Sequence, residues 1–197
     1  ALANNFVTFG SCNNIAKLSS EVIQAWSEIL AKVENSRLLL KHRAFDNADR
    51  RALITESFSA AGISEDRLIL RGFTPDPADY LSVYNEIDIA LDPFPFGGGT
   101  VSYEALWMGV PVLTLAGDVL MGRLTGSLMQ RLGLPDWVTH SSADYITTAE
   151  RLAADTAALA ALRKGLRAKA RDTIFDAKAH VLELEAVFEN AWRDQAD

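Results

Sequence analysis

Cysteine and histidine are both scarce in this chain. Its 197 residues include one cysteine, Cys12, and three histidines. A single thiol cannot close a disulfide within the chain, so we expect a reducing compartment, the cytoplasm. The CxxC and HExxH patterns of common zinc sites are absent, and we expect no bound metal.

The chain also lacks an excess of positive charge and any long apolar run. It has 19 Lys and Arg against 26 Asp and Glu, a net charge of −7. This balance disfavours a protein that coats DNA or RNA, although a local basic pocket for one phosphorylated ligand remains compatible with it. No apolar run approaches the roughly 20 residues of a membrane-spanning helix, and the first ten residues lack the features of a signal peptide. We therefore expect neither a nucleic acid nor a membrane as partner.

Apolar segments suited to strands alternate with amphipathic ones suited to helices. The pattern predicts strands at residues 6–9, 37–41, 67–71, 87–92 and 111–115, and helices at about 20–33, 47–61, 78–85 and 100–108. Helices are expected to dominate after about residue 120, and the last of them is striped by Val181, Leu184, Phe188, Ala191 and Trp192. This alternation predicts one α/β domain over residues 1–197, a mostly parallel sheet with helices on both faces at about 1–140 and C-terminal helices at about 141–197.

Three loops should meet at the carboxyl edge of this sheet, where open α/β sheets bind ligands: residues 10–17, 72–80 and 92–100. In the third loop, three glycines precede a helix that begins at Thr100. The backbone amides of Gly98 and Gly99 and the hydroxyl of Thr100 suit a phosphate, because a helix start carries partial positive charge. The alternative is an ordinary turn.

Two charged residues complete this candidate site. Glu104 lies four residues after Thr100, so both project from one helix face, and a carboxylate there suits sugar hydroxyls better than phosphate. Lys17 follows the first strand and can neutralise a diphosphate. The structural alternatives are a glutamate favoured by the helix dipole and a solvated surface lysine.

Long stretches of the sequence resemble one family. Residues 84–100 read YNEIDIALDPFPFGGGT and residues 104–115 read EALWMGVPVLTL. Both resemble the C-terminal catalytic half of the O-linked N-acetylglucosamine transferase and SPINDLY family. Residues 9–17 are similar to the first strand and loop of that half, and residues 175–192 to its closing helices. The resemblance implies the donor-binding, Rossmann-like C-terminal half of a glycosyltransferase-B fold. It also implies that an N-terminal half and upstream tetratricopeptide repeats belong to the same protein.

The resemblance further implies an activity. Most members of the family transfer N-acetylglucosamine from UDP-N-acetylglucosamine to a Ser or Thr hydroxyl of a protein, and the SPINDLY branch can use GDP-fucose. No metal or other cofactor is implied, because a lysine and a helix start can stabilise the diphosphate. By position, the resemblance implies Lys17 as catalytic residue, Asn14 and Lys17 at the diphosphate, Thr74 and Pro75 beside the base, Gly98, Gly99 and Thr100 at the phosphates, and Glu104 on the ribose.

Four positions depart from the family pattern. Gly99 stands in place of a histidine, Val101 in place of a threonine, Asp76 in place of a lysine and Tyr80 in place of a histidine. These differences remove a ring and a charge from the pocket. Two alternatives therefore stay open: a non-catalytic nucleotide-sugar-binding or docking domain, and, less favoured, a nucleotide-sugar epimerase of the same fold.

Overall fold

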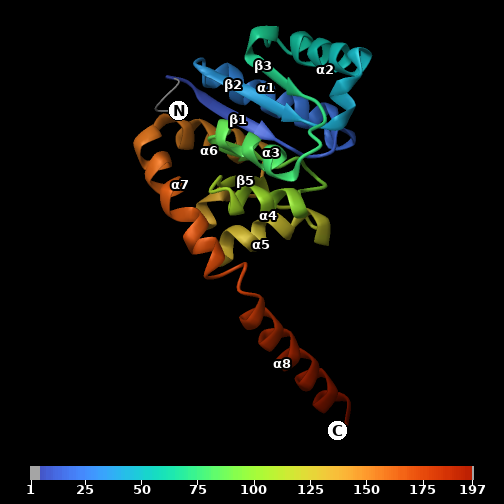
Figure 1. Ribbon diagram of the computed structural model, residues 1–197, viewed down its shortest axis with the longest axis vertical. Helices are drawn as coiled ribbons and strands as arrows, with labels where there is room; N and C mark the ends of the chain where they lie inside the picture. The colour runs from blue at the N-terminus through green and yellow to red at the C-terminus, as the bar shows by residue number, and fades with distance from the viewer. Residues whose placement is uncertain (1–4, 197) are drawn as a thin grey trace.

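A parallel sheet forms the centre of the computed structural model, which describes residues 5–196 (Figure 1). Within these residues its six strands lie in the order β3-β2-β1-β4-β5-β6. The strands are β1 (Val7–Ser11), β2 (Ser36–Lys41), β3 (Leu68–Arg71), β4 (Ile89–Leu91), β5 (Val112–Leu115) and β6 (Val138–Thr139). The chain builds one side of the sheet outward from β1 and then the other from β4. The strand order therefore reverses between β1 and β4, which is where such folds place a ligand.

The five predicted strands are confirmed within two residues at every end, but β6 was not predicted. This strand has two residues, and it joins the sheet by pairing Val138 with Thr114. The hydroxyl of Thr139 also donates to the carbonyl oxygen of Thr114 at 3.0 Å. Two residues are too short to give a periodic apolar pattern, so the sequence carries no signal for β6.

Helices connect the strands. They are α1 (Ser20–Lys32), α2 (Ala48–Ala60), α3 (Pro77–Ser82), α4 (Thr100–Trp107), α5 (Leu124–Arg131), α6 (Ser142–Ala154), α7 (Thr156–Arg171) and α8 (Ala177–Ala196). Short 3-10 turns are η1 (Ile15–Lys17), η2 (Arg43–Asp46), η3 (Glu65–Arg67), η4 (Val83–Glu86), η5 (Leu120–Gly122) and η6 (Pro135–Trp137).

Some helix ends agree with the prediction because a capping side chain or a glycine fixes them. Ser19 caps α1 by accepting from the amide of Val22, and Gly62 and Gly109, with φ of +86° and +74°, follow the ends of α2 and α4.

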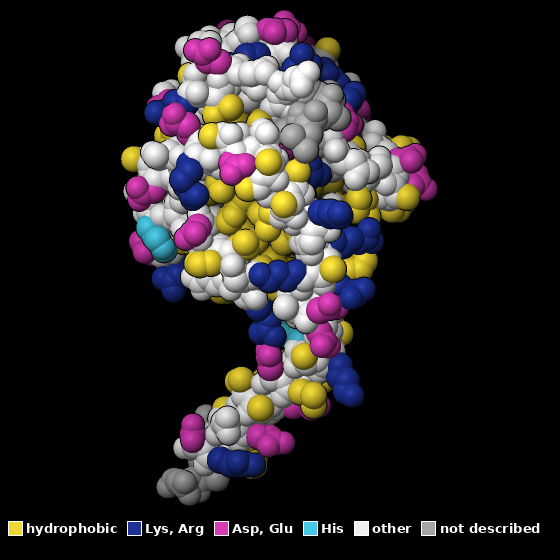
Figure 2. All heavy atoms as spheres, turned by 90° about the vertical axis from the view of Figure 1, so that its left-hand side faces the viewer, with side chains coloured by type: hydrophobic (Ala, Val, Ile, Leu, Met, Phe, Trp, Pro, Cys, Tyr) yellow, Lys and Arg dark blue, Asp and Glu magenta, His cyan; other side chains and the backbone are white. Residues whose placement is uncertain are grey.

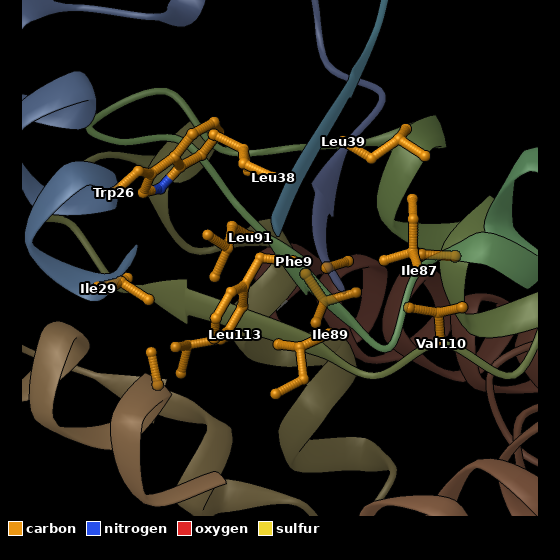
Figure 3. Packing of buried hydrophobic residues seen from close by; sticks show 14 of the residues in the cluster. Phe9, Trp26, Ile29, Leu38, Leu39, Ile87, Ile89, Leu91, Val110 and Leu113 are labelled. Carbon is orange, nitrogen blue, oxygen red and sulfur yellow. The ribbon is translucent and has the colours of Figure 1, made fainter. Parts of the chain in front are cut away.

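The core lies on both faces of the sheet. Figure 3 shows Trp26 and Ile29 of α1 on the same side as Phe9, and all three are fully buried. The indole nitrogen of Trp26 donates to the hydroxyl of Tyr145 in α6 at 3.2 Å, so α1 and α6 lie side by side on this face. On the other face α4 contacts β5 and α7, and its first turns line a small pocket together with the ends of β1 and β4. The sheet thus fixes the start of α4 at the point where the strand order reverses.

Helix α8 projects from the body of the molecule (Figures 1 and 2). Arg131 of α5 holds its base through two contacts with Glu183, at 2.7 and 3.0 Å. The predicted apolar stripe faces solvent: the large exposed side chains are Val181, Leu182, Leu184, Val187, Phe188 and Trp192. None of the helices within residues 5–196 combines the length and the apolar character needed to cross a membrane.

Candidate functional site

The first and third predicted loops meet at Lys17. Its side chain, half-buried at the end of η1, donates to the carbonyl oxygen of Gly97 at 2.7 Å and to Oδ1 of Asn13 at 3.1 Å. The nitrogen also lies 4.7 Å from the centre of the Phe96 ring. An ammonium has three hydrogens, so one remains for a further acceptor. Burial lowers the pKa of Lys17, and the nearby carboxylate of Asp92 opposes this shift.

Asp92 organises the glycine loop from inside. It is 1% exposed; Oδ1 accepts from the amide of Gly98 at 2.6 Å and Oδ2 from the hydroxyl of Thr114 at 2.9 Å. Burial raises the pKa of Asp92, although these two hydrogen bonds lower it in part. A Cβ at Gly97 or Gly98 would lie within 2.8 or 2.9 Å of a carboxylate oxygen of Asp92. The loop therefore needs glycine at both positions, because a methyl group would collide with the group that holds the loop.

The open backbone amides begin one residue later. The amides of Gly99, Thr100 and Val101 have no acceptor among the residues that the structure describes, and no side chain caps the start of α4. Gly99 faces open space, and Thr100 is exposed. The amide of Gly98, in contrast, is occupied by Asp92. An anion at this helix start would therefore meet the amides of Gly99 and Thr100 first.

The second predicted loop is fastened by a residue that sequence reasoning missed. Lys41, at the end of β2, is only 4% exposed. Its nitrogen donates to the carbonyl oxygen of Gly72 at 2.6 Å and to the hydroxyl of Thr74 at 2.7 Å. Pro75 follows on the surface, and Asp76 caps α3 through the amides of its first turn. The one available signal was a lysine at the carboxyl end of a buried strand.

Glu104 is half-buried beside two tyrosine hydroxyls. Tyr80 donates to its Oε2 at 2.8 Å, and the hydroxyl of Tyr84 lies 3.2 Å from the same atom. The nitrogen of Lys41 lies 5.6 Å from the centre of the Tyr80 ring. Lys41 therefore links the Thr74 loop to Glu104 through Tyr80, a contact that the sequence did not reveal.

The structure brings most of the predicted residues to one edge but not all of them into contact. A small pocket between the ends of β1 and β4 is lined by Asn13, the partner of Lys17, and by Tyr84, the partner of Glu104. Asn14 is exposed, and its side chain accepts from the amide of Ala16 within its own turn. Within residues 5–196, no group of three or more His, Cys, Asp or Glu side chains is placed to hold a metal ion.

The strand order and this edge define the class of the protein: a Rossmann-like α/β domain with a lysine and an open helix start at its strand-order reversal. The chain belongs to glycosyl transferase family 41, whose profile matches residues 1–184.

Relatives and solved structures agree with this family. The chain is 37% identical over 198 residues to the probable UDP-N-acetylglucosamine–peptide N-acetylglucosaminyltransferase SPINDLY of Oryza sativa subsp. japonica, covering 100% of this chain and 21% of that protein. The same-named protein of Arabidopsis thaliana is 37% identical over 196 residues, again with 21% of its length covered. A mutant O-GlcNAc transferase of Thermobaculum terrenum superposes with a TM-score of 0.90 at 36% identity, over 98% of this chain and 37% of that one.

These matches confirm the predicted family and the predicted fold, the C-terminal half of a glycosyltransferase-B fold. The chain spans about a fifth of the length of the curated relatives that it matches, at 21% of each. The roles assigned to individual site residues stay predictions.

Proposed function

We propose that this chain is the donor-nucleotide-binding half of a cytoplasmic protein O-glycosyltransferase. The full protein would transfer N-acetylglucosamine from UDP-N-acetylglucosamine to a Ser or Thr hydroxyl. The observation that carries the proposal is the Lys17 ammonium, held on the carbonyl oxygen of Gly97 beside the open amides of Gly99 and Thr100. The names of the similar proteins support the same reaction. The N-terminal half and upstream tetratricopeptide repeats would complete the protein.

In the proposed reaction the acceptor oxygen attacks the anomeric carbon of the sugar. The bond from that carbon to the diphosphate oxygen breaks, and UDP leaves with the electron pair. The negative charge on the leaving phosphate grows in the transition state, so the third hydrogen of Lys17 and the amides of α4 stabilise that state more than the ground state. The proton of the acceptor passes to a base in the N-terminal half or to the donor phosphate.

No metal ion is needed in this proposal. An ammonium and a helix start already supply positive charge on one side of the diphosphate. Glu104 would accept hydrogen bonds from the ribose, and Thr74 and Pro75 would border the base. Asn14 would contact the diphosphate by turning its side chain away from the amide of Ala16, where it now points.

Titration and transfer assays test the proposal together. Purified full-length protein is titrated with UDP, GDP, UDP-N-acetylglucosamine and GDP-fucose, and transfer to protein is followed with a radiolabelled donor. The proposal predicts UDP-dependent binding and release of UDP with a labelled protein product. A preference for GDP-fucose would instead assign the donor of the SPINDLY branch, and a converted free nucleotide sugar would identify an epimerase.

The alternative of a non-catalytic binding domain has one structural observation in its favour. Asp76, which replaces the lysine of the family pattern, accepts from the amides of Ala78 and Asp79 at 2.7 and 3.0 Å. The residue has thus become a helix cap, and the cation is lost from this loop. Nucleotide binding by the full-length protein without any turnover would favour this alternative.

A further inference from the structure

The two oxygens of the Glu104 carboxylate have different surroundings. Tyr80, in α3, donates its hydroxyl to Oε2 at 2.8 Å, and the hydroxyl of Tyr84, in η4, lies 3.2 Å from the same atom. Oε1 has no donor among the residues that the structure describes. One oxygen of the carboxylate is therefore occupied, while the other is an open acceptor.

Neighbouring groups hold both tyrosines in place. Tyr84 is 1% exposed, and its hydroxyl also lies 3.3 Å from the carbonyl oxygen of Val101. The ring of Tyr80 stands at 90° to that of Tyr84, with 6.3 Å between the ring centres. Tyr80 is also in contact with Lys41, whose nitrogen lies 5.6 Å from the centre of the Tyr80 ring. Burial raises the pKa of both tyrosines, so both hydroxyls keep their protons and remain donors.

We propose that Tyr80 and Tyr84 are positioning residues, which hold Oε2 of Glu104 and thereby present Oε1 to the ribose hydroxyls of the donor nucleotide. The inference rests on the proposed function, since it takes Glu104 as the ribose contact. A free glutamate side chain would lose rotational freedom when the ribose binds. This carboxylate has already been oriented during folding, and a hydrogen bond to it therefore contributes more to affinity.

The ribose contact can be isolated by comparing UDP with 2′,3′-dideoxy-UDP, which lacks both ribose hydroxyls. Calorimetric titration of the intact protein gives the two dissociation constants and their ratio. The wild type should bind UDP more tightly than the dideoxy analogue, and Glu104→Gln should remove most of that preference. Tyr80→Phe should reduce the preference about three- to ten-fold, the loss typical of one hydrogen bond. The affinity for the dideoxy analogue should remain within about two-fold, because its binding does not use Oε1.

Tyr103→Phe is the matched control. Tyr103 lies in α4 like Glu104, is 40% exposed, and has no hydrogen-bonded hydroxyl among the described residues, so its loss should leave the preference unchanged. Tyr84→Phe should act in the same direction as Tyr80→Phe. If the buried Tyr84 variant does not fold, the half-buried Tyr80 variant decides alone.

Two failures are distinguishable. If Glu104→Gln removes the preference for UDP but Tyr80→Phe keeps it at the wild-type value, the positioning role is overturned while the proposed function stands. If the wild type binds UDP and its dideoxy analogue equally, or binds neither, the nucleotide contact proposed for Glu104 is overturned, and the positioning role with it.

Discussion

At the scale of single residues, Lys17 is the most direct test of the proposed chemistry. We expect Lys17→Ala to lower the turnover of the full-length protein about ten- to a hundred-fold, because a charge-assisted hydrogen bond to phosphate contributes roughly 1.5–3 kcal/mol. The fold should persist, since the side chain is half-buried and lies at the edge of the sheet. Initial rates and the thermal unfolding midpoint measure the two effects separately.

Lys164→Ala provides the matched control for Lys17. Lys164 lies in α7, is exposed, and has no hydrogen bond or ion pair with another side chain among the described residues. Its loss should leave turnover unchanged. Wild-type rates in Lys17→Ala would show that Lys17 is a structural link between two loops and takes no part in transfer.

Cys12 should be unreactive while the protein is folded. It is 7% exposed, and burial raises its pKa to about 12, so almost no thiolate exists near pH 8. We expect a disulfide reagent such as DTNB to react at least about a hundred-fold more slowly with the folded protein than with the protein in denaturant. Equal rates in both states would mean that the end of β1 opens readily.

Sequence reasoning pointed to the more exposed side chains of the candidate site but not to the buried ones that support them. Both predicted charged residues follow a recognisable sequence pattern: Lys17 comes after the end of a strand, and Glu104 after a glycine-rich helix start. The hydrogen bonds that support this site come from three buried side chains, each no more than 4% exposed: Asp92, Lys41 and Tyr84. Which polar side chains become buried, and which donors they meet, depends on contacts between segments far apart in the chain, such as Lys41 with Thr74. No local pattern records such contacts.

At the scale of elements, the loop before α4 allows a matched pair of glycine substitutions. A Cβ at Gly98 would lie 2.3 Å from the hydroxyl oxygen of Ser102 and 2.9 Å from Oδ1 of Asp92, whereas one at Gly99 would meet nothing within 4 Å. We expect Gly98→Ala to reduce the free energy of unfolding by about 1–3 kcal/mol, as overpacking does, and Gly99→Ala to have a much smaller effect. Chemical denaturation measures both. Equal losses would show that Asp92 does not hold the loop.

The strands and helices were predictable for a physical reason that β6 lacks. Strand segments buried on both faces, such as Leu38 to Leu40 of β2 and all of β4, read as continuous apolar runs, and glycines at positive φ mark where α2 and α4 stop. β6 exists because Val138 reaches the free edge of β5, and that edge is created only when the sheet assembles.

At the scale of the whole molecule, the proposed reaction needs a second half. We expect the 197-residue chain, expressed alone, to fold, to bind UDP weakly and to transfer no sugar, because the proposed N-terminal half, which would cover the bound donor from the other side, would be missing. A radiolabelled-donor assay run beside the full-length protein measures this. Robust transfer by the chain alone would contradict the two-half mechanism.

The exposed apolar face of α8 also bears on the expected second half of the protein. Its side chains include Phe188 at 64% exposure and Trp192 at 78%, and we expect the N-terminal half to cover them in the full-length protein. The chain alone should therefore self-associate through α8, and Trp192→Glu should reduce this self-association. Light scattering across a concentration series measures it, and Lys178→Glu, also on α8 but polar already, is the control. A chain that stays monomeric at all concentrations would contradict the expectation.

The bond from Lys17 to the carbonyl oxygen of Gly97 joins the two sides of the strand-order reversal before any ligand arrives. These two loops are consequently ordered during folding rather than on binding. A nucleotide therefore meets hydrogen-bond donors, the Lys17 ammonium and the amides at the start of α4, that are already in position. The temperature dependence of binding should then be that of a rigid receptor, with a small heat-capacity change. Ligand exchange would then be limited by how fast the proposed N-terminal half moves away from the nucleotide, since the backbone of these two loops is already ordered and only a side chain such as that of Asn14 has to turn.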